Sequence, residues 1–154
     1  MDFFNKHGNF ERLHVEGTIK FQMCNDKVFD EFDTFDNASI WIYPELIKND
    51  LRVWVYSGDV DADVPITGTI AWLERFREEH RIPVEEPWRE WWVPGLHKHE
   101  DQVGGMVWSM RGLKFVSIKG AGHEVPRDKK PEAYVLIDKF LNGEHMPYKD
   151  EGDS

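Results

Sequence analysis

Two turns in this sequence carry residue types that could perform acid–base chemistry. Residues 120–126 (GAGHEVP) place His123 in a glycine-rich turn, and residues 57–65 (SGDVDADVP) carry three aspartates. Each turn follows a strand-like run, residues 113–118 and 51–56 respectively. An imidazole titrates near neutral pH and can take up and return a proton, whereas a carboxylate can accept its N–H and fix its tautomer. The two turns together predict a relay that activates a hydroxyl nucleophile.

Several segments around these turns resemble the C-terminal third of the serine carboxypeptidases in order and spacing. They are YSGDVDADVP, QVGG, GLKFVSIKGAGHEVP and FLNGEHMP, preceded by FFNKHGNFERLHV, QMCND and YPELIKNDLRVW. The likeness covers nearly the whole chain, more loosely over residues 83–100 and after Tyr148. That family has an α/β-hydrolase fold and removes single residues from peptide C-termini. The resemblance implies the C-terminal part of such a fold, with central sheet strands and flanking helices, in residues 1–147, followed by a polar tail in residues 148–154.

The resemblance also assigns roles within the acidic turn. The family pattern G-x-x-D, counted from Gly58, selects Asp61 as the acid of a catalytic triad whose base is His123. Asp61 would accept the imidazole N–H and fix the tautomer rather than take up the proton itself. We expect Asp59 to hold the loop through backbone hydrogen bonds and Asp63 to face solvent.

The third member of the triad, the nucleophile, is missing from this sequence. Serines occur at positions 39, 57, 109, 117 and 154, and none is flanked as G-x-S-x-G. Ser57 ends the strand that precedes the acid, so it cannot also occupy an elbow of its own. In the family the nucleophile lies well upstream in a GESYAG-type motif, near the oxyanion donors and the groups that grip the substrate's terminal carboxylate. Alone, the chain would hold two of three triad members and be inactive.

The resemblance implies partners that the sequence does not contain. Some family members are cut into a large and a small chain joined by a disulfide, and this chain could be the small one or a truncated part of one polypeptide. Cys24, the lone cysteine, stands where the family forms a disulfide to its N-terminal region; a buried thiol is the alternative. Asn37 begins an N-A-S glycosylation sequon. The expected location is the secretory pathway, in a lysosome or vacuole or after secretion, and the expected substrate is a peptide C-terminus.

Glu124 directly follows the candidate base. In the family this position lines the pocket for the departing residue, and either glutamate or an apolar residue occurs there. Glu124 would favour a basic C-terminal residue; a solvated acid beside the turn is the alternative.

Other clusters favour plainer interpretations. The D-x-D-x-D run lacks the glycine and the distant glutamate of a calcium loop. Residues 97–101 (HKHED) are typical of a solvated loop more than of a metal site. The tryptophans at 88, 91 and 92 are expected to pack in the interior, with a substrate cleft as the alternative. No metal and no cofactor are predicted.

Composition narrows the classes of function. The chain has 154 residues, enough for one domain, with a net charge of -10 and a pI near 5.1. An acidic chain without a basic stripe argues against nucleic acid as a partner. No window approaches 18 consecutive apolar residues, so no membrane span is predicted. Two rivals to a carboxypeptidase remain: an acyltransferase or hydroxynitrile lyase with the same triad, and a non-catalytic truncated homologue that acts as a binding protein.

The elements that position these residues follow from hydrophobic periodicity. We expect helices over residues 2–15, 39–49, 66–80 and 131–141, and strands over residues 51–56, 102–110 and 113–118. Residues 16–37 have no clean periodicity, and we expect Phe21, Phe29, Phe32 and Phe35 to dock on a larger body. Residues 83–100 are expected to form a loop with a short strand at 89–93. The predicted helix caps are Ser39, Thr67 or Thr69, and Asp128. Asn142–Gly143 is expected to end the last helix.

The predicted strands 51–56 and 113–118 should be parallel and belong to the end of the central sheet. Their carboxyl ends would then present Asp61 and His123 side by side. Strands 102–110 and 113–118 are joined by Arg111–Gly112, which is typical of a tight hairpin.

Overall fold

A computed structural model describes residues 3–6, 8–15, 20–32, 39–93 and 101–149. The chain divides into two compact units, Met1–Ala38 and Ser39–Ser154, which are described separately. The predicted boundary at residue 147 concerns the whole hydrolase domain and stays a prediction. No helix in the described segments is long and apolar enough to cross a lipid bilayer.

The first unit contains two short helices, α1 (Asn9–Arg12) and α2 (Asp26–Glu31). Backbone in the left-handed region bounds α1 on both sides, with φ of 81° at Gly8 and 56° at His14. The helix predicted over residues 2–15 is therefore reduced to one turn, and the prediction is wrong in length. α2 was not predicted; it begins after Asn25, whose side-chain oxygen accepts the Val28 N–H at 3.2 Å.

Phenylalanines of the first unit were expected to dock on a larger body. Phe29 and Phe32 are 82% and 70% exposed, and Phe21 packs on Phe4 with 4.7 Å between ring centroids. Phe35 lies outside the described residues. The first unit thus buries little of its own apolar surface, and the docking of these rings stays a prediction.

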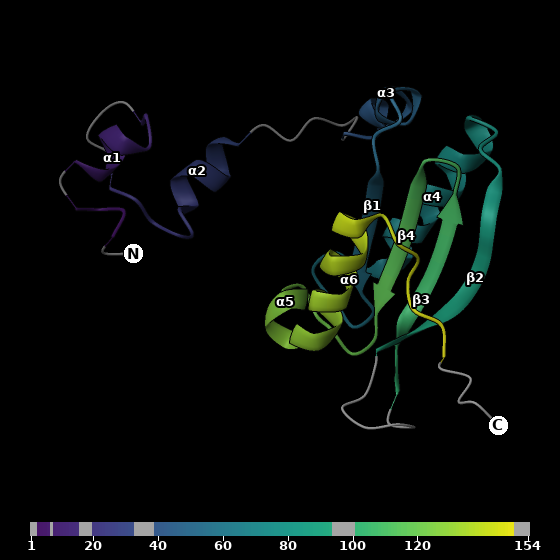
Figure 1. Cartoon of the computed structure of the whole chain (residues 1–154). Helices are drawn as coiled ribbons and strands as arrows, with labels where there is room; N and C mark the ends of the chain where they lie inside the picture. The colour runs from purple at the N-terminus through teal and green to yellow at the C-terminus, as the bar shows by residue number, and fades with distance from the viewer. Residues whose placement is uncertain (1–2, 7, 16–19, 33–38, 94–100, 150–154) are drawn as a thin grey trace. The chain divides into compact units, whose positions relative to one another are not determined.

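The second unit is built on a four-stranded mixed sheet in the order β1–β4–β3–β2 (Figure 1). Its strands are β1 (Val53–Gly58), β2 (Val84–Val93), β3 (Gln102–Met110) and β4 (Leu113–Ile118). β1 and β4 pair in parallel, with Gly58 opposite Ile118, and β3 is antiparallel to both its neighbours. The predicted parallel pair is confirmed. So is the hairpin between β3 and β4, which turns at Gly112 with a φ of 76° that suits glycine.

Helices cover both faces of this sheet (Figure 1). They are α6 (Lys130–Asn142) on one face and α4 (Ile66–Glu79) on the other. Leu136 of α6 belongs to a buried cluster with Val116 of β4, and Phe76 of α4 belongs to a second cluster with Phe115. Because successive side chains of a strand point to opposite faces, the single strand β4 contributes to both cores. This two-sided burial agrees with the apolar residues at four of its six positions, the others being Lys114 and Ser117.

The helical segment before β1 is shorter than predicted. It divides into a 3-10 turn, η1 (Ile40–Ile42), and a helix, α3 (Tyr43–Lys48). Pro44 lies in the first turn of α3, the place where proline is tolerated. Ser39 precedes η1 but makes no side-chain cap, so that predicted cap is wrong.

Two further predicted caps are also wrong. Pro65 precedes α4 and Lys129 precedes α6, and neither helix has a side-chain cap there. Thr69 is buried inside α4 instead, and Asp128 ends a short unpredicted helix, α5 (Val125–Asp128). The end of α6 is confirmed, because Gly143 follows it with a φ of 71°.

The largest correction concerns residues 83–100, which were expected to form a loop with a short strand. β2 spans ten of them as the outermost strand of the sheet. Its pairing with β3 shifts register between Glu86 and Arg89, which accommodates Pro87 because an edge strand tolerates a missing N–H at an irregularity. Trp88 stacks on Trp108 with 5.3 Å between centroids, and Trp91 is fully buried in the other core. Trp91 therefore agrees with the predicted interior role, whereas Trp88 remains 38% exposed and Trp92 is only partly buried.

Candidate active site

The acidic loop after β1 is folded around one carboxylate. Asp61 Oδ1 accepts the backbone N–H of Asp63 at 2.8 Å and of Val64 at 3.1 Å. Such side-chain-to-backbone bonds are the means by which aspartate closes a tight turn. Only 7% of the Asp61 side chain is exposed. The loop thereby fixes the carboxylate and leaves Oδ2 for a partner outside the loop.

The turn after β4 is tied directly to that loop. Asp59 Oδ1 accepts the Gly120 N–H at 2.6 Å, and the Ala121 carbonyl accepts the Val60 N–H at 3.1 Å. At Gly58 the two segments approach so closely that an added Cβ would lie 2.2 Å from the Ala121 carbonyl oxygen. A glycine is therefore required where β1 leaves the sheet. The predicted role of Asp59 in holding the loop agrees with this bond.

Asp128 holds the same turn from the other side. Its Oδ2 accepts the Gly122 N–H at 2.9 Å, one residue before His123. Asp128 was expected to cap a helix, and its bond to the turn of His123 was not predicted. The signal was an aspartate a few residues beyond a Gly-x-Gly turn, which is too common a pattern to identify the bond in advance.

The two turns bring Asp61 and His123 together. His123 Nδ1 lies 3.0 Å from Asp61 Oδ2, and His123 Nε2 lies 3.6 Å from Asp63 Oδ2. The imidazole is 57% exposed, whereas the Asp61 carboxylate is nearly buried. Asp63 is 79% exposed, as predicted, although it also faces the imidazole. The geometry suits an acid that orients a base whose second nitrogen remains accessible.

Electrostatics strengthen the pairing. The hydrogen bond to Asp61, reinforced by that carboxylate's charge, raises the pKa of His123 above its ordinary 6.5. Burial alone would raise the pKa of Asp61, but hydrogen bonds from the Val64 N–H and the imidazole outweigh it. The pKa of Asp61 is therefore below its ordinary 3.8. Both shifts favour the charged forms, so the imidazole can hold a proton more readily than a solvated histidine.

A pocket of about 330 Å³ opens beside the pair. Its lining residues are Tyr56, Ser57, Gly58, Asp61, Val64, His123 and Val125. Ser57 is buried and its hydroxyl lies 3.4 Å from that of Thr69, which agrees with a structural role. In the part of the chain that the structure describes, no serine hydroxyl hydrogen-bonds to His123.

The other predicted site residues take no part in the contact between Asp61 and His123. Glu124 is exposed and its Oε2 lies 2.6 Å from Arg127 Nη1. Cys24 is an exposed free thiol in the first unit. Asn37 and residues 97–100 lie outside the described residues, so the glycosylation and HKHED interpretations cannot be placed. The described residues contain no group of three side chains arranged to hold a metal ion.

The family model described as serine carboxypeptidase matches residues 1–143. "Serine carboxypeptidase-like 26" of Oryza sativa subsp. japonica is 34% identical over 95% of this chain, and "Putative serine carboxypeptidase-like 23" of Arabidopsis thaliana is 39% identical over 94%. "P-(S)-hydroxymandelonitrile lyase" of Sorghum bicolor is 35% identical over 91%. The matches span 29%, 30% and 26% of these relatives respectively, so this chain corresponds to under a third of their length.

A solved structure shows the same fold. The Kex1 carboxypeptidase of Saccharomyces cerevisiae, described as prohormone-processing, superimposes with a TM-score of 0.66 over 92% of this chain and 30% of that one, at 21% identity. The mixed sheet with helices on both faces is thus the C-terminal portion of an α/β-hydrolase fold, as the sequence implied. On the extent of the family match and these relatives, the chain belongs to the serine carboxypeptidase family.

Proposed function

We propose that this chain supplies the acid and the base of a serine carboxypeptidase triad, and that the nucleophilic serine comes from residues outside these 154. The observation that carries the proposal is the 3.0 Å contact between His123 Nδ1 and Asp61 Oδ2, in which the acid is fixed by its own loop. His123 Nε2 is then the nitrogen that would face the serine hydroxyl. Family membership supports the assignment of a hydrolase.

In the assembled enzyme, His123 Nε2 would accept the serine proton as the alkoxide attacks the C-terminal peptide carbonyl. The protonated imidazole would then give its proton to the departing amino acid, leaving an acyl-enzyme. Water, deprotonated by the same imidazole, would release the shortened peptide. Asp61 would stay ionised throughout because its pKa is low. Its negative charge would stabilise the imidazolium in each step.

The remaining features of the chain extend this proposal. Cys24, exposed and unpaired in the first unit, would form the disulfide to the large chain or N-terminal region. Glu124 would line the pocket of the departing residue, where its contact with Arg127 moderates its charge. The proposal also includes glycosylation at Asn37 and a location in the secretory pathway, which would be lysosomal, vacuolar or secreted. Without its partner the chain would be inactive.

The test is fluorophosphonate labelling of native material that contains this chain, with mass spectrometry to locate the labelled peptide before and after reduction. We expect the label on a serine outside these residues, either on the same polypeptide or joined through Cys24. Absence of label from a chain found alone would overturn the enzyme assignment and favour a non-catalytic binding protein. A label on a serine within the chain would also contradict the proposal.

Matched aspartate variants of the same assembly, without the label, test the role of the acid. Asp61→Asn removes the carboxylate that fixes the tautomer and should lower kcat by about 10⁴-fold. Asp50→Asn is the control, because Asp50 is exposed and its φ of 53° is one that asparagine adopts readily. Equal activity of the two variants would remove Asp61 from the triad.

A lyase is the second candidate, because one of the reported relatives is named as a hydroxynitrile lyase. The same acid–base pair could abstract a proton from a cyanohydrin hydroxyl. Peptide hydrolysis, followed with blocked dipeptides, and cyanide release from hydroxymandelonitrile separate the two on one preparation. Cyanide release without peptide hydrolysis would favour the lyase.

A further inference from the structure

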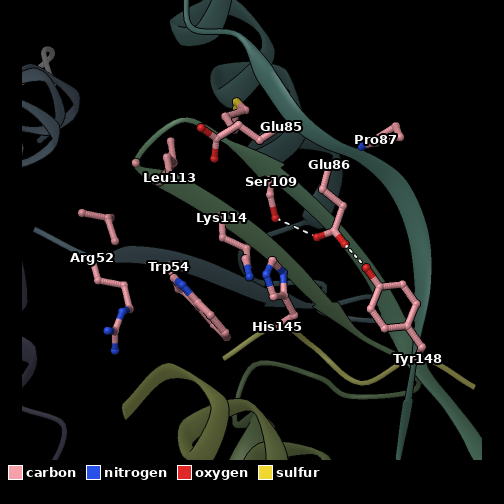
Figure 2. A pocket seen from close by; sticks show the side chains of 13 residues that line it. Arg52, Trp54, Glu85, Glu86, Pro87, Ser109, Leu113, Lys114, His145 and Tyr148 are labelled. Atoms are coloured by element: carbon pink, nitrogen blue, oxygen red, sulfur yellow. Dashed lines mark hydrogen bonds between the residues drawn. The ribbon is translucent and has the colours of Figure 1, made fainter. Parts of the chain in front are cut away.

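A second pocket lies at the opposite end of the strands that carry the candidate triad residues. It occupies about 420 Å³ beside the first residues of β1 and β4, whereas Asp61 and His123 follow the last residues of these strands. Figure 2 shows side chains from four separate segments around this hollow. The polar and aromatic ones include Trp54, Glu86, Ser109, Lys114, His145 and Tyr148. No residue lines both pockets.

Glu86, one of two glutamates that line this pocket, accepts hydrogen bonds from three side chains. Its Oε1 accepts Arg89 Nε–H at 2.7 Å. Figure 2 shows the other two bonds, in which Oε1 accepts the Tyr148 hydroxyl at 2.9 Å and Oε2 accepts the Ser109 hydroxyl at 3.0 Å. Burial alone would raise the pKa of Glu86, but these donors, Arg89 foremost, lower it. The glutamate therefore fastens β2 to the C-terminal segment. Its charge also raises the pKa of Lys114 without a direct contact, although the effect of burial on Lys114 outweighs it.

Lys114 is the cation that lacks such a partner. It lies half-buried on β4, with its ammonium 4.4 Å from the centre of the Trp54 ring. Within the described residues, no carboxylate lies within 4.0 Å of Lys114 Nζ. Partial removal from water lowers the pKa of Lys114 because it disfavours the charged form. A bound anion would offset that penalty.

The other charged groups of the lining are accounted for. Arg52 donates to the carbonyls of Phe140 and Leu141 at the end of α6. Glu85 is exposed and lies 3.9 Å from Arg111. The two glutamates limit how much negative charge the pocket can accept, so a monoanion suits it better than a doubly charged phosphate.

We propose that this pocket binds a carboxylate group attached to a flat apolar body, with Lys114 paired to the carboxylate and Trp54 in contact with the apolar body. His145, which points into the hollow beside Lys114 (Figure 2), adds a second donor for the carboxylate. The Lys114 ammonium lies 4.4 Å from the centre of the Trp54 ring and has no carboxylate partner among the described residues, and an aromatic ring beside such a cation is the combination that recognises small aromatic acids. The site is distinct from the proposed catalytic pair and does not depend on it.

The test uses two probes of the same shape, naphthalene-2-carboxylate and the neutral naphthalene-2-carboxamide. Binding to the unmodified protein is measured by isothermal titration. We expect the carboxylate to bind about tenfold more tightly than the amide, the effect of one charge-assisted hydrogen bond. Equal affinity for the two probes, or no binding of either, would overturn the proposal. This comparison needs no variant and is unaffected by changes in folding.

Matched lysine variants test the assignment of the partner. Lys114→Gln should abolish the preference for the carboxylate over the amide, because the positive charge that distinguishes the two probes is lost. Lys48→Gln is the control, since Lys48 on α3 is 76% exposed and lies outside the pocket lining. Both variants are compared with the parent by near-UV circular dichroism. Retention of the preference in Lys114→Gln would overturn the assignment.

The carboxylate could belong to a free acid or to a side chain of a longer polypeptide that contains this chain. Titration of both forms with naphthalene-2-carboxylate separates the two sources. Binding that is equal in both forms identifies a free acid. Binding that is present in the 154-residue chain and lost in the longer one identifies an internal carboxylate at the same site.

Discussion

The two ends of the paired strands β1 and β4 differ in how their charges are satisfied. At the carboxyl ends, Asp61 and His123 are in contact. The turn that carries His123 is held by hydrogen bonds to the carboxylates of Asp59 and Asp128. At the amino ends, Glu86 accepts from three donors, while Lys114 makes no ion pair with a carboxylate of the described residues and lies over the Trp54 ring. The acid and the base at the carboxyl ends are thus paired within this chain, whereas the lysine at the amino ends is the group that we propose binds a carboxylate.

The difference follows from how each end is assembled. The candidate catalytic end uses two turns, each of which directly follows one strand of a parallel pair, so that local sequence positions both groups. The amino-end pocket collects residues from β1, β2, β3, β4 and the segment after α6. A site made from many elements depends on their packing, whereas the acid–base pair depends mainly on one close approach between two turns.

Gly58→Ala tests that close approach and should have the largest effect on stability. The added Cβ would lie 2.2 Å from the Ala121 carbonyl oxygen, and backbone on both sides leaves little room to move. We expect the free energy of unfolding to fall by about 2 kcal/mol, the cost of overpacking, and the contact between Asp61 and His123 to lengthen. Urea unfolding and the NMR signals of His123 measure the two effects.

Gly68→Ala is the matched control for this change. Gly68 lies in α4, and an added Cβ there meets nothing within 4 Å. It should raise the free energy of unfolding by up to about 1 kcal/mol, because alanine favours a helix over glycine. If the two variants were equally stable, the close approach at Gly58 would not control the candidate site.

Glu86→Gln addresses the amino end and should have a smaller effect. The amide keeps the side-chain shape but loses the charge that binds Arg89, and it can no longer accept at both oxygens. Arg89 Nη2–H also donates to the Met146 carbonyl at 2.8 Å, so part of the connection to the C-terminal segment survives. We expect a loss of about 1–2 kcal/mol in the free energy of unfolding.

Glu85→Gln, at the neighbouring position, is the control. Its side chain is 56% exposed and lies 3.9 Å from Arg111, so stability should change by less than about 0.5 kcal/mol. Chemical unfolding of both variants under identical conditions makes the comparison. A loss from Glu85→Gln as large as that from Glu86→Gln would mean that the bonds to Arg89, Ser109 and Tyr148 contribute nothing specific.

The contrast between the two ends also explains what the sequence could predict. The parallel strands and their turns were predictable because apolar runs and glycine-rich turns are local signals, and family resemblance selected Asp61 among three aspartates. The full length of β2 was not predictable, because Pro87 and its polar neighbours are typical of a loop. In the structure, the edge position of β2 and a register shift accommodate them. The pocket at Lys114 was not predictable either, since residues as far apart in the sequence as Arg52 and Tyr148 line it.

Helix ends were the other weak point, for a related reason. Asp128 has the residue type of a cap, yet its carboxylate bonds to Gly122 and not to the start of α6. A side chain that can satisfy either of two backbone groups is assigned by tertiary structure, which a local pattern does not contain. For the same reason, the role of Asp128 in holding the turn of His123 could not be predicted from the sequence.

The finest comparison is between the two carboxylates that face His123. Because Asp61 accepts the Nδ1–H and Asp63 acts only through its charge, Asp61→Asn should lower the pKa of His123 clearly, and Asp63→Asn only slightly. In the parent chain the pKa should lie above 6.5. An NMR titration of the His123 Cε1–H signal measures all three values.

The stability of the fold should follow the same shifts. Since folding raises the pKa of His123, its contribution to the free energy of unfolding is complete below the unfolded value near 6.5 and is lost as pH rises through the folded value. Asp61 acts in the opposite sense: its contribution is present above its ordinary 3.8 and is lost as pH falls through its lowered folded value. The two contributions therefore coincide at mildly acidic pH. An Asp63→Asn variant that lowered the pKa of His123 as much as Asp61→Asn would show that the exposed carboxylate, and not the nearly buried one, governs the base.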